Sequence, residues 1–157
     1  MNSNNLKQAV LAGLLAGALF LVLEMILVPL VFGGNAWGPS RMIAGIVMGE
    51  QVVTGTGFNV GVVLIALLLH FALSVFYAII IAYLSSPFGK GTTAFFGGIV
   101  GFVIYLINFY LLSEMFFPWF AEARNWLSAL VHVLFGGVAG YTYKALRERY
   151  EEHCVTC

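Results

Sequence analysis

Long apolar runs alternate along this chain with short segments that contain glycine, proline and polar residues. A membrane-spanning helix needs about 20 consecutive, mostly apolar residues. Four runs have this character, at 6–32, 59–84, 92–116 and 126–146. Helix-breaking segments separate them, with the sequences GGNAWGP, SSPFGKG and FFPWF. The pattern predicts an all-α fold: a single membrane domain built as a bundle of four transmembrane helices.

Two shorter segments are expected to cap one end of this bundle. Ser40 follows Pro39 and is expected to cap a short helix that runs through Gln51. That helix is too short to span a membrane, and several of its apolar residues share one side, so an interfacial position is expected. The segment FPWFAEARNW is expected to form a similar cap before the fourth run.

Composition supports a membrane location. Hydrophobic residues make up 61% of the 157 residues and charged residues only 9%, against roughly 25% charged residues in soluble domains. A chain with so little charge cannot cover a water-facing surface, so the lipid bilayer is the expected surroundings. The net charge is zero, and no basic face indicates a nucleic-acid partner. The first run exceeds the core of a signal peptide, which has about 7–15 residues, and is therefore expected to be a retained span.

The basic residues predict the orientation of the helices, because short cytoplasmic loops are rich in Lys and Arg. One side of the predicted topology carries Arg41 and Arg124. The other side carries five basic residues, namely Lys7, Lys90, Lys144, Arg147 and Arg149. This asymmetry predicts that both termini, including a tail at 147–157, lie in the cytoplasm.

Each predicted span carries a stripe of small residues at helical spacing. Such stripes let helices approach closely within lipid. The stripes consist of Gly13 and Gly17, of Ser74, Ala78 and Ala82, of Gly97 and Gly101, and of Gly136 and Gly140. Packing of these faces within one chain is favoured because every span has one. Contacts with another membrane subunit, or with a second copy, remain the alternative.

Each stripe leads to one strongly polar residue on the same face of its helix. Glu24 lies seven residues after Gly17, and Asn108 lies seven after Gly101, which is nearly two helical turns. His70 and His132 each precede a small residue by four positions. A carboxylate facing lipid would cost about 2.5 kcal/mol or more. The four residues are therefore expected to converge in the outer half of the bundle as a candidate binding site.

Three hypotheses account for this cluster. In the first, the polar groups only join helices, and the protein is a non-enzymatic accessory or scaffold subunit of a larger membrane complex. In the second, His70 and His132 bind haem b, or join Glu24 as ligands of a single divalent metal. In the third, Glu24 and the two histidines form a path for protons or a small solute, which Tyr77, Tyr83 and Tyr105 extend inward. The chain has no catalytic motif that would identify an enzyme.

The tail and several internal stretches add two further interpretations. His153, Cys154 and Cys157 form an H-C-x-x-C sequence, for which exposed cytoplasmic thiols are favoured over a metal or redox site. The stretches WGPSRMIAG, HFALSVFYAIIIAYL, YLINFY and FPWFAEARNW resemble a group of uncharacterised small bacterial inner-membrane proteins with four predicted spans. The resemblance covers most of the chain from Trp37 onward. It implies a bacterial inner membrane and no particular activity or ligand.

Overall fold

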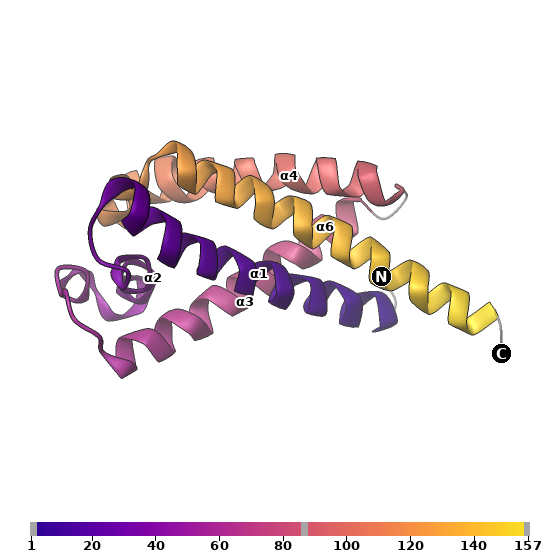
Figure 1. Cartoon of the computed structure of the whole chain (residues 1–157), viewed down its shortest axis with the longest axis horizontal. Helices are drawn as coiled ribbons and strands as arrows, with labels where there is room; N and C mark the ends of the chain where they lie inside the picture. Colours follow the sequence, from indigo (N-terminus) through magenta and orange to yellow (C-terminus); the bar gives the residue numbers. More distant parts are fainter. Residues whose placement is uncertain (1–2, 86–87, 156–157) are drawn as a thin grey trace.

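The computed structural model describes residues 3–85 and 88–155, with side chains up to residue 152. In this part of the chain the protein is almost entirely helical and contains no strand, so the all-α prediction is confirmed. The helices form an elongated bundle (Figure 1). The elements are α1 (Ser3–Phe32), α2 (Gly38–Met48), η1 (Glu50–Val52), α3 (Val60–Leu84), α4 (Lys90–Leu106), η2 (Ile107–Leu112), α5 (Ser113–Met115), η3 (Pro118–Ala123) and α6 (Trp126–Val155).

Three helices within the described residues are long and apolar enough to cross a membrane. They are α1, α3 and the continuous helical segment Lys90–Met115, which joins α4, η2 and α5. Large apolar side chains such as Leu30, Leu68 and Phe95 project outward from these helices and are mostly exposed. A surface of this kind indicates a protein that lies in lipid.

Helix α6 is not among these three, and its position in the bundle explains why. It packs against α4, α1 and α3. Its contact faces carry small and polar residues, including Ser128, His132 and Gly136. Positions that contact protein need not be apolar, and polar residues inside membrane bundles usually face the interior. Helix α6 therefore has a weaker hydropathy signal than the three helices named above.

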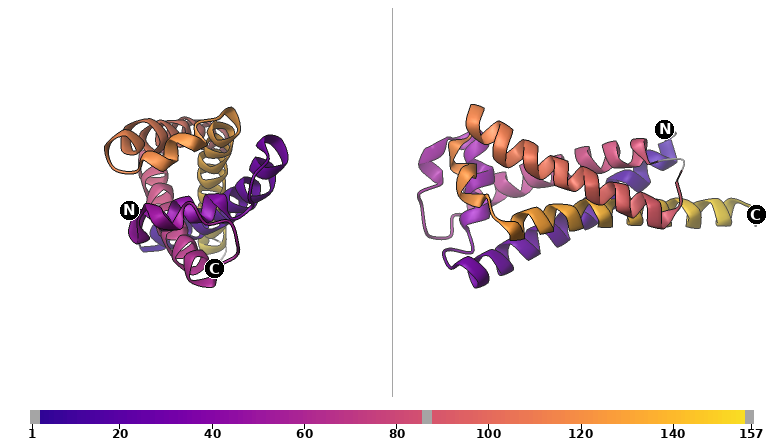
Figure 2. Two further views of the ribbon diagram at one scale, coloured as in Figure 1. Left: turned by 90° about the vertical axis from the view of Figure 1, so that its left-hand side faces the viewer. Right: turned by 90° about the horizontal axis from the view of Figure 1, so that it is seen from above.

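The bundle has two different ends (Figures 1 and 2). Both chain termini lie at one end, which we call the terminal end. Helix α2 and the 3-10 segment η3 lie across the opposite end, which we call the loop end. An ion pair between Lys90 and Glu148, 2.8 Å long, joins α4 to α6 at the terminal end.

Helices α4 and α6 pack at backbone distance along their glycines. A Cβ atom added at Gly97 would lie 2.1 Å from the carbonyl oxygen of Gly136, and one at Gly101 would lie 2.0 Å from that of His132. A Cβ at Gly140 would lie 2.5 Å from the carbonyl oxygen of Thr93. The small-residue stripes of these two helices are thus used within the chain.

Helices α1 and α3 pack in a similar way through small residues. A Cβ atom added at Gly13 would lie 2.8 Å from the Cα of Val75, and one at Gly17 would lie 2.6 Å from the Oγ of Ser74. Towards the terminal end these helices close around a core that includes Ala16, Ala78 and Ala139. The bundle is therefore tightly closed at the terminal end. By contrast, α3 and α4 make few contacts with each other.

Helix α2 begins and ends differently from the sequence prediction. The sequence predicts Ser40 as its N-cap, and this is wrong: the helix begins at Gly38, with Trp37 as N-cap and a proline in its first turn. Proline is favoured there because its missing N–H needs no partner. The helix ends at Met48, before Gln51, because Gly49 takes a positive φ of 88° that favours glycine.

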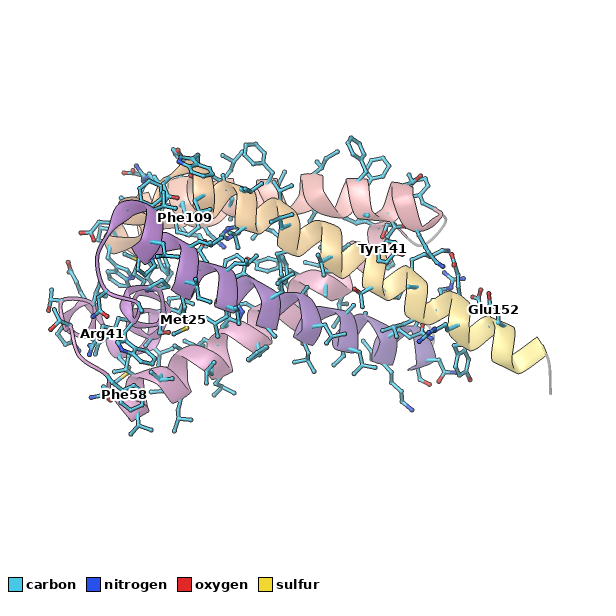
Figure 3. All side chains as sticks on the ribbon, viewed as in Figure 1. Met25, Arg41, Phe58, Phe109, Tyr141 and Glu152 are labelled. Carbon is cyan, nitrogen blue, oxygen red and sulfur yellow. The ribbon has the colours of Figure 1, made fainter. Side chains whose placement is uncertain are left out.

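Helix α2 and η3 form a cover over the loop end. The indole Nε1–H of Trp119 in η3 donates a hydrogen bond of 3.1 Å to the carbonyl oxygen of Met42 in α2. Arg41 anchors the chain that follows α2: its guanidinium donates to the carbonyl oxygens of Val52 (2.8 Å) and Gly57. Arg41 lies in this cover in Figure 3. The cover is thus joined by side-chain bonds to backbone atoms.

Candidate functional site

A cavity of about 620 Å³ lies at the loop end, beneath the cover. Residues from α1, α3, α4, η2 and α6 form its walls, and α2 and η3 contribute residues from above. The walls are mainly aliphatic and aromatic. The aromatic residues include Phe20, Tyr77, Phe109, Phe117, Phe120 and Phe135. The loose contact between α3 and α4 leaves room for this space, whereas the packed core closes it towards the terminal end.

All four polar residues selected from the sequence line this one cavity. Glu24 comes from α1, His70 from α3, Asn108 from η2 and His132 from α6. Three of them are almost completely buried, with exposed fractions of 7% for Glu24, 7% for His70 and 5% for His132. The structure therefore brings together four side chains that are up to 108 positions apart in a chain of 157 residues.

His70 is oriented by the backbone of α1. Its Nε2–H donates a hydrogen bond of 2.8 Å to the carbonyl oxygen of Gly17, because a carbonyl can only accept. The hydroxyl of Ser74, one turn away, donates to the carbonyl oxygen of His70 at 2.7 Å. In a neutral ring, Nδ1 is then the nitrogen that keeps a lone pair. The small stripe of α1 and α3 thus also fixes this imidazole.

His132 is oriented by its own helix and enclosed by aromatic rings. Its Nδ1–H donates to the carbonyl oxygen of Ser128 at 2.7 Å, so Nε2 keeps the lone pair in a neutral ring. The rings of Phe20, Tyr105 and Phe109 lie 4.8, 5.6 and 5.3 Å from the imidazole, measured between centroids. Phe20 also contacts the ring of His70, at 5.4 Å. One phenylalanine therefore packs against both imidazoles.

Glu24 is the least satisfied polar group of the cavity. Its Oε2 accepts a long hydrogen bond of 3.5 Å from the hydroxyl of Ser128, and its Oε1 is buried without a hydrogen-bond partner. The described residues offer it no ion pair with a basic side chain. Ser128 links it to His132 through the serine carbonyl. A buried carboxyl oxygen without a partner is rare and costly.

Asn108 lies on a π-helical turn that interrupts the third apolar helix. The turn is η2, Ile107–Leu112, and Asn108 accepts a long hydrogen bond of 3.5 Å from the hydroxyl of Tyr77. Arg124 holds this turn from the following loop: its Nε–H donates to the carbonyl oxygen of Phe109, and an Nη–H donates to the hydroxyl of Ser113 at 2.7 Å. Phe109 is labelled at the loop end in Figure 3. Single π-helical turns occur frequently at functional sites.

The charged side chains along the cavity are acidic. Glu24 lies deep in the wall, and Glu122 of η3 lies near the exposed mouth. The two basic residues of the loop end are not lining residues. Arg41 is bonded to carbonyl oxygens of the cover, and Arg124 forms an ion pair with Glu114 in addition to its bonds on η2. Apart from the two imidazoles, the described lining of this cavity thus offers no cationic group.

The described part of the chain contains no group of three or more His, Cys, Asp or Glu side chains placed to hold a metal ion. The H-C-x-x-C sequence of the tail is not included in this finding. The side chains of His153 and Cys154 and the whole of Cys157 lie outside the described residues.

The three tyrosines of the suggested inward path do not continue one another. Tyr77 lines the cavity. The hydroxyl of Tyr105 instead donates a hydrogen bond of 3.3 Å to the carbonyl oxygen of Asn125. Asn125 directly precedes α6 at the loop end, so this tyrosine does not lead inward. The side chain of Tyr83 is 71% exposed on the outer surface of α3.

Several lining residues could not be selected from the sequence. Phe20 and Ser128 look like ordinary members of apolar helices, and Glu122 looks like a solvated loop residue. Only their closeness to Glu24 and the histidines in the folded chain gives them a place in the site. No family model, curated protein or solved structure matches this chain.

Proposed function

We propose that this chain is a small membrane protein that binds a small, largely apolar molecule in the cavity at its loop end. The observation that carries the proposal is the cavity itself. Its volume of about 620 Å³ falls within the roughly 300–1,000 Å³ typical of ligand pockets. Such pockets combine apolar walls with a few polar groups that orient the ligand, as Glu24, His70, Asn108 and His132 would do here.

We propose a placement in the membrane that puts this cavity near the outer surface. Helix α6 would make a fourth crossing, because it packs along α4 and has the length to do so. The five basic residues of the terminal end would face the cytoplasm, and α2 would lie in the outer interface. Together with the resemblance to small bacterial inner-membrane proteins, this gives a binding site that opens towards the periplasmic side.

A bound haem is a less suitable occupant than an organic ligand. Phe20 packs against both imidazoles and would have to move before an iron could be clamped between them. The charged groups along the described lining are acidic, which is unfavourable for haem propionates. A proton or solute path also fits less well, since the small-residue core closes the terminal half of the bundle.

A role as an accessory subunit is the second candidate, and one surface feature favours it. A shallow apolar groove of about 530 Å³ runs along the outer faces of α4 and α6, lined by Ala94, Gly98, Gly137 and neighbouring apolar residues. Small residues on an outward face allow another transmembrane helix to approach closely. We therefore assign this groove to a helix of another membrane subunit. The alternative occupant is a second copy of the chain, and native mass spectrometry would distinguish the two by mass.

The proposed function is tested by looking for a molecule that purifies with the protein. The experiment is native mass spectrometry after mild detergent extraction, with an optical spectrum of the same sample. The blocking variant is Val28→Trp, which adds a large side chain to the cavity wall one turn beyond Glu24. Its matched control is Leu30→Trp, two positions away on a 75% exposed surface.

We expect a bound small molecule in the wild type and in Leu30→Trp, and none in Val28→Trp. Equal retention in Val28→Trp would overturn the proposed site. A Soret band that disappears in both His70→Ala and His132→Ala would replace the proposal with haem binding. A large protein partner that is lost in Gly98→Leu, without a bound small molecule, would favour the accessory subunit.

A further inference from the structure

We propose that the molecule bound in this cavity is a lipophilic organic cation, with Glu24 as its counter-charge. This inference rests on the proposed function and names the class of ligand. It starts from the unsatisfied carboxyl oxygen. Glu24 is 7% exposed, and its Oε1 has no hydrogen-bond partner. A buried carboxylate charge is usually paired with a positive charge, and a cationic ligand would supply the partner that the described residues do not.

The distribution of charge around the cavity favours a cation over an anion. Glu24 and Glu122 are the charged residues that line the described cavity. Arg41 and Arg124 do not balance these carboxyl groups, because both guanidinium groups are bonded to other parts of the loop end. An acidic cavity concentrates cations and repels anions.

The aromatic walls favour an organic cation in particular. The face of an aromatic ring carries negative charge density, so a cation within about 6 Å of the ring centroid is attracted to it. Phe20, Tyr77 and Phe109 line the same cavity as Glu24, and four further phenylalanines, Phe32, Phe117, Phe120 and Phe135, line it as well. An ammonium group on an apolar body would bury its body against these rings and its charge near Glu24.

A metal ion does not account for the same features. The described residues contain no group of three or more metal-ligand side chains. The volume of the cavity is also far larger than one ion needs. The ring nitrogens of His70 and His132 that keep lone pairs would instead accept hydrogen bonds from an N–H or O–H group of the ligand.

The test compares two probes of the same size and shape and of opposite charge, tetraphenylphosphonium and tetraphenylborate. Binding is measured by titration calorimetry on the full chain in nanodiscs of zwitterionic lipid, with empty nanodiscs as the blank. We expect saturable binding of tetraphenylphosphonium at one site per chain and no saturable binding of tetraphenylborate.

The variants separate the charge of Glu24 from its shape. Loss of one partner of a buried charge pair predicts that Glu24→Gln weakens tetraphenylphosphonium binding by about 30-fold or more. Glu50→Gln, an exposed glutamate of η1 outside the cavity, is the matched control and should bind as the wild type does. If Glu24→Gln fails to fold, Glu24→Asp keeps the charge and should keep the preference for the cation.

The outcomes distinguish this inference from the proposed function. Equal binding by the wild type and Glu24→Gln would overturn the inference, as would tetraphenylborate binding that matches or exceeds that of the cation. If tetraphenylborate binds and this binding is abolished in Val28→Trp, the cavity still binds small molecules and only the ligand class is wrong. If neither probe binds and no small molecule purifies with the protein, both proposals fall.

Discussion

Gly97 and Gly98 are adjacent on α4 and face different surroundings, so the same substitution should have opposite effects. A Cβ atom at Gly97 would lie 2.1 Å from the carbonyl oxygen of Gly136 and 2.9 Å from its carbon. A Cβ at Gly98 would meet a methyl group of Val133 at 3.4 Å, which is an ordinary contact. Gly97→Ala therefore forces α4 and α6 apart, whereas Gly98→Ala does not.

The size of the effect follows from how much contact is lost. Relieving the Gly97 clash needs a separation of about 1 Å, and a gap of that size forfeits roughly a quarter to a half of each dispersion contact along the interface. Over the many contacts of two long helices this amounts to about 2–3 kcal/mol of unfolding free energy. Gly98→Ala instead gains helix propensity, worth up to about 1 kcal/mol.

The measurement is reversible unfolding of the purified protein in mixed micelles with increasing sodium dodecyl sulfate, followed by circular dichroism. We expect the transition of Gly97→Ala to shift to lower detergent fraction and that of Gly98→Ala to stay or to rise. Equal stability of the two variants would refute the close packing of α4 on α6. A loss confined to Gly98→Ala would show that the outward groove, not the glycine contact, stabilises the bundle.

Three further predictions concern the loop end. Arg124→Gln removes the donors that hold the π-helical turn, so amide hydrogen exchange over 107–112 should become about tenfold faster; unchanged exchange would contradict this role. Arg41→Met leaves two backbone carbonyls without their donor and should lower the unfolding free energy by about 2 kcal/mol, with faster proteolysis within 53–58; resistance equal to the wild type would count against the anchor. Asn59→Ala removes the side-chain cap of α3 and should cost about 1 kcal/mol of unfolding free energy, whereas Asn59→Asp should not; equal losses in both would exclude capping.

The apolar runs predict the helices well because lipid-facing positions must be apolar however the helices pack. The predicted run 59–84 corresponds to α3, Val60–Leu84, and the run 6–32 to α1, Ser3–Phe32. The same reasoning predicts less about α6. One of its faces packs against α4, α1 and α3, and its composition reflects these protein contacts.

The partners of the glycines and the shape of the cavity depend on distant parts of the chain. Helical spacing shows that Gly97 and Gly17 lie on packing faces, but not that Gly97 meets Gly136 and that Gly17 meets Ser74. The π-helical turn has no Pro or Gly to mark it in the sequence INFYLL. It is held by Arg124, which lies in another loop. Such features come from tertiary contacts, which periodicity does not encode.

The bond between Trp119 and Met42 has a consequence for how the protein is made. Helix α2 leaves the ribosome early, whereas η3 and the wall supplied by α6 follow only after most of the chain has been synthesised. Glu24 is therefore synthesised well before Trp119 and Ser128. During synthesis the carboxyl group of this first helix therefore lacks the hydroxyl donor that Ser128 of α6 later supplies. Retention of the proposed ligand would consequently report that the whole bundle has assembled, rather than that any one helix has formed.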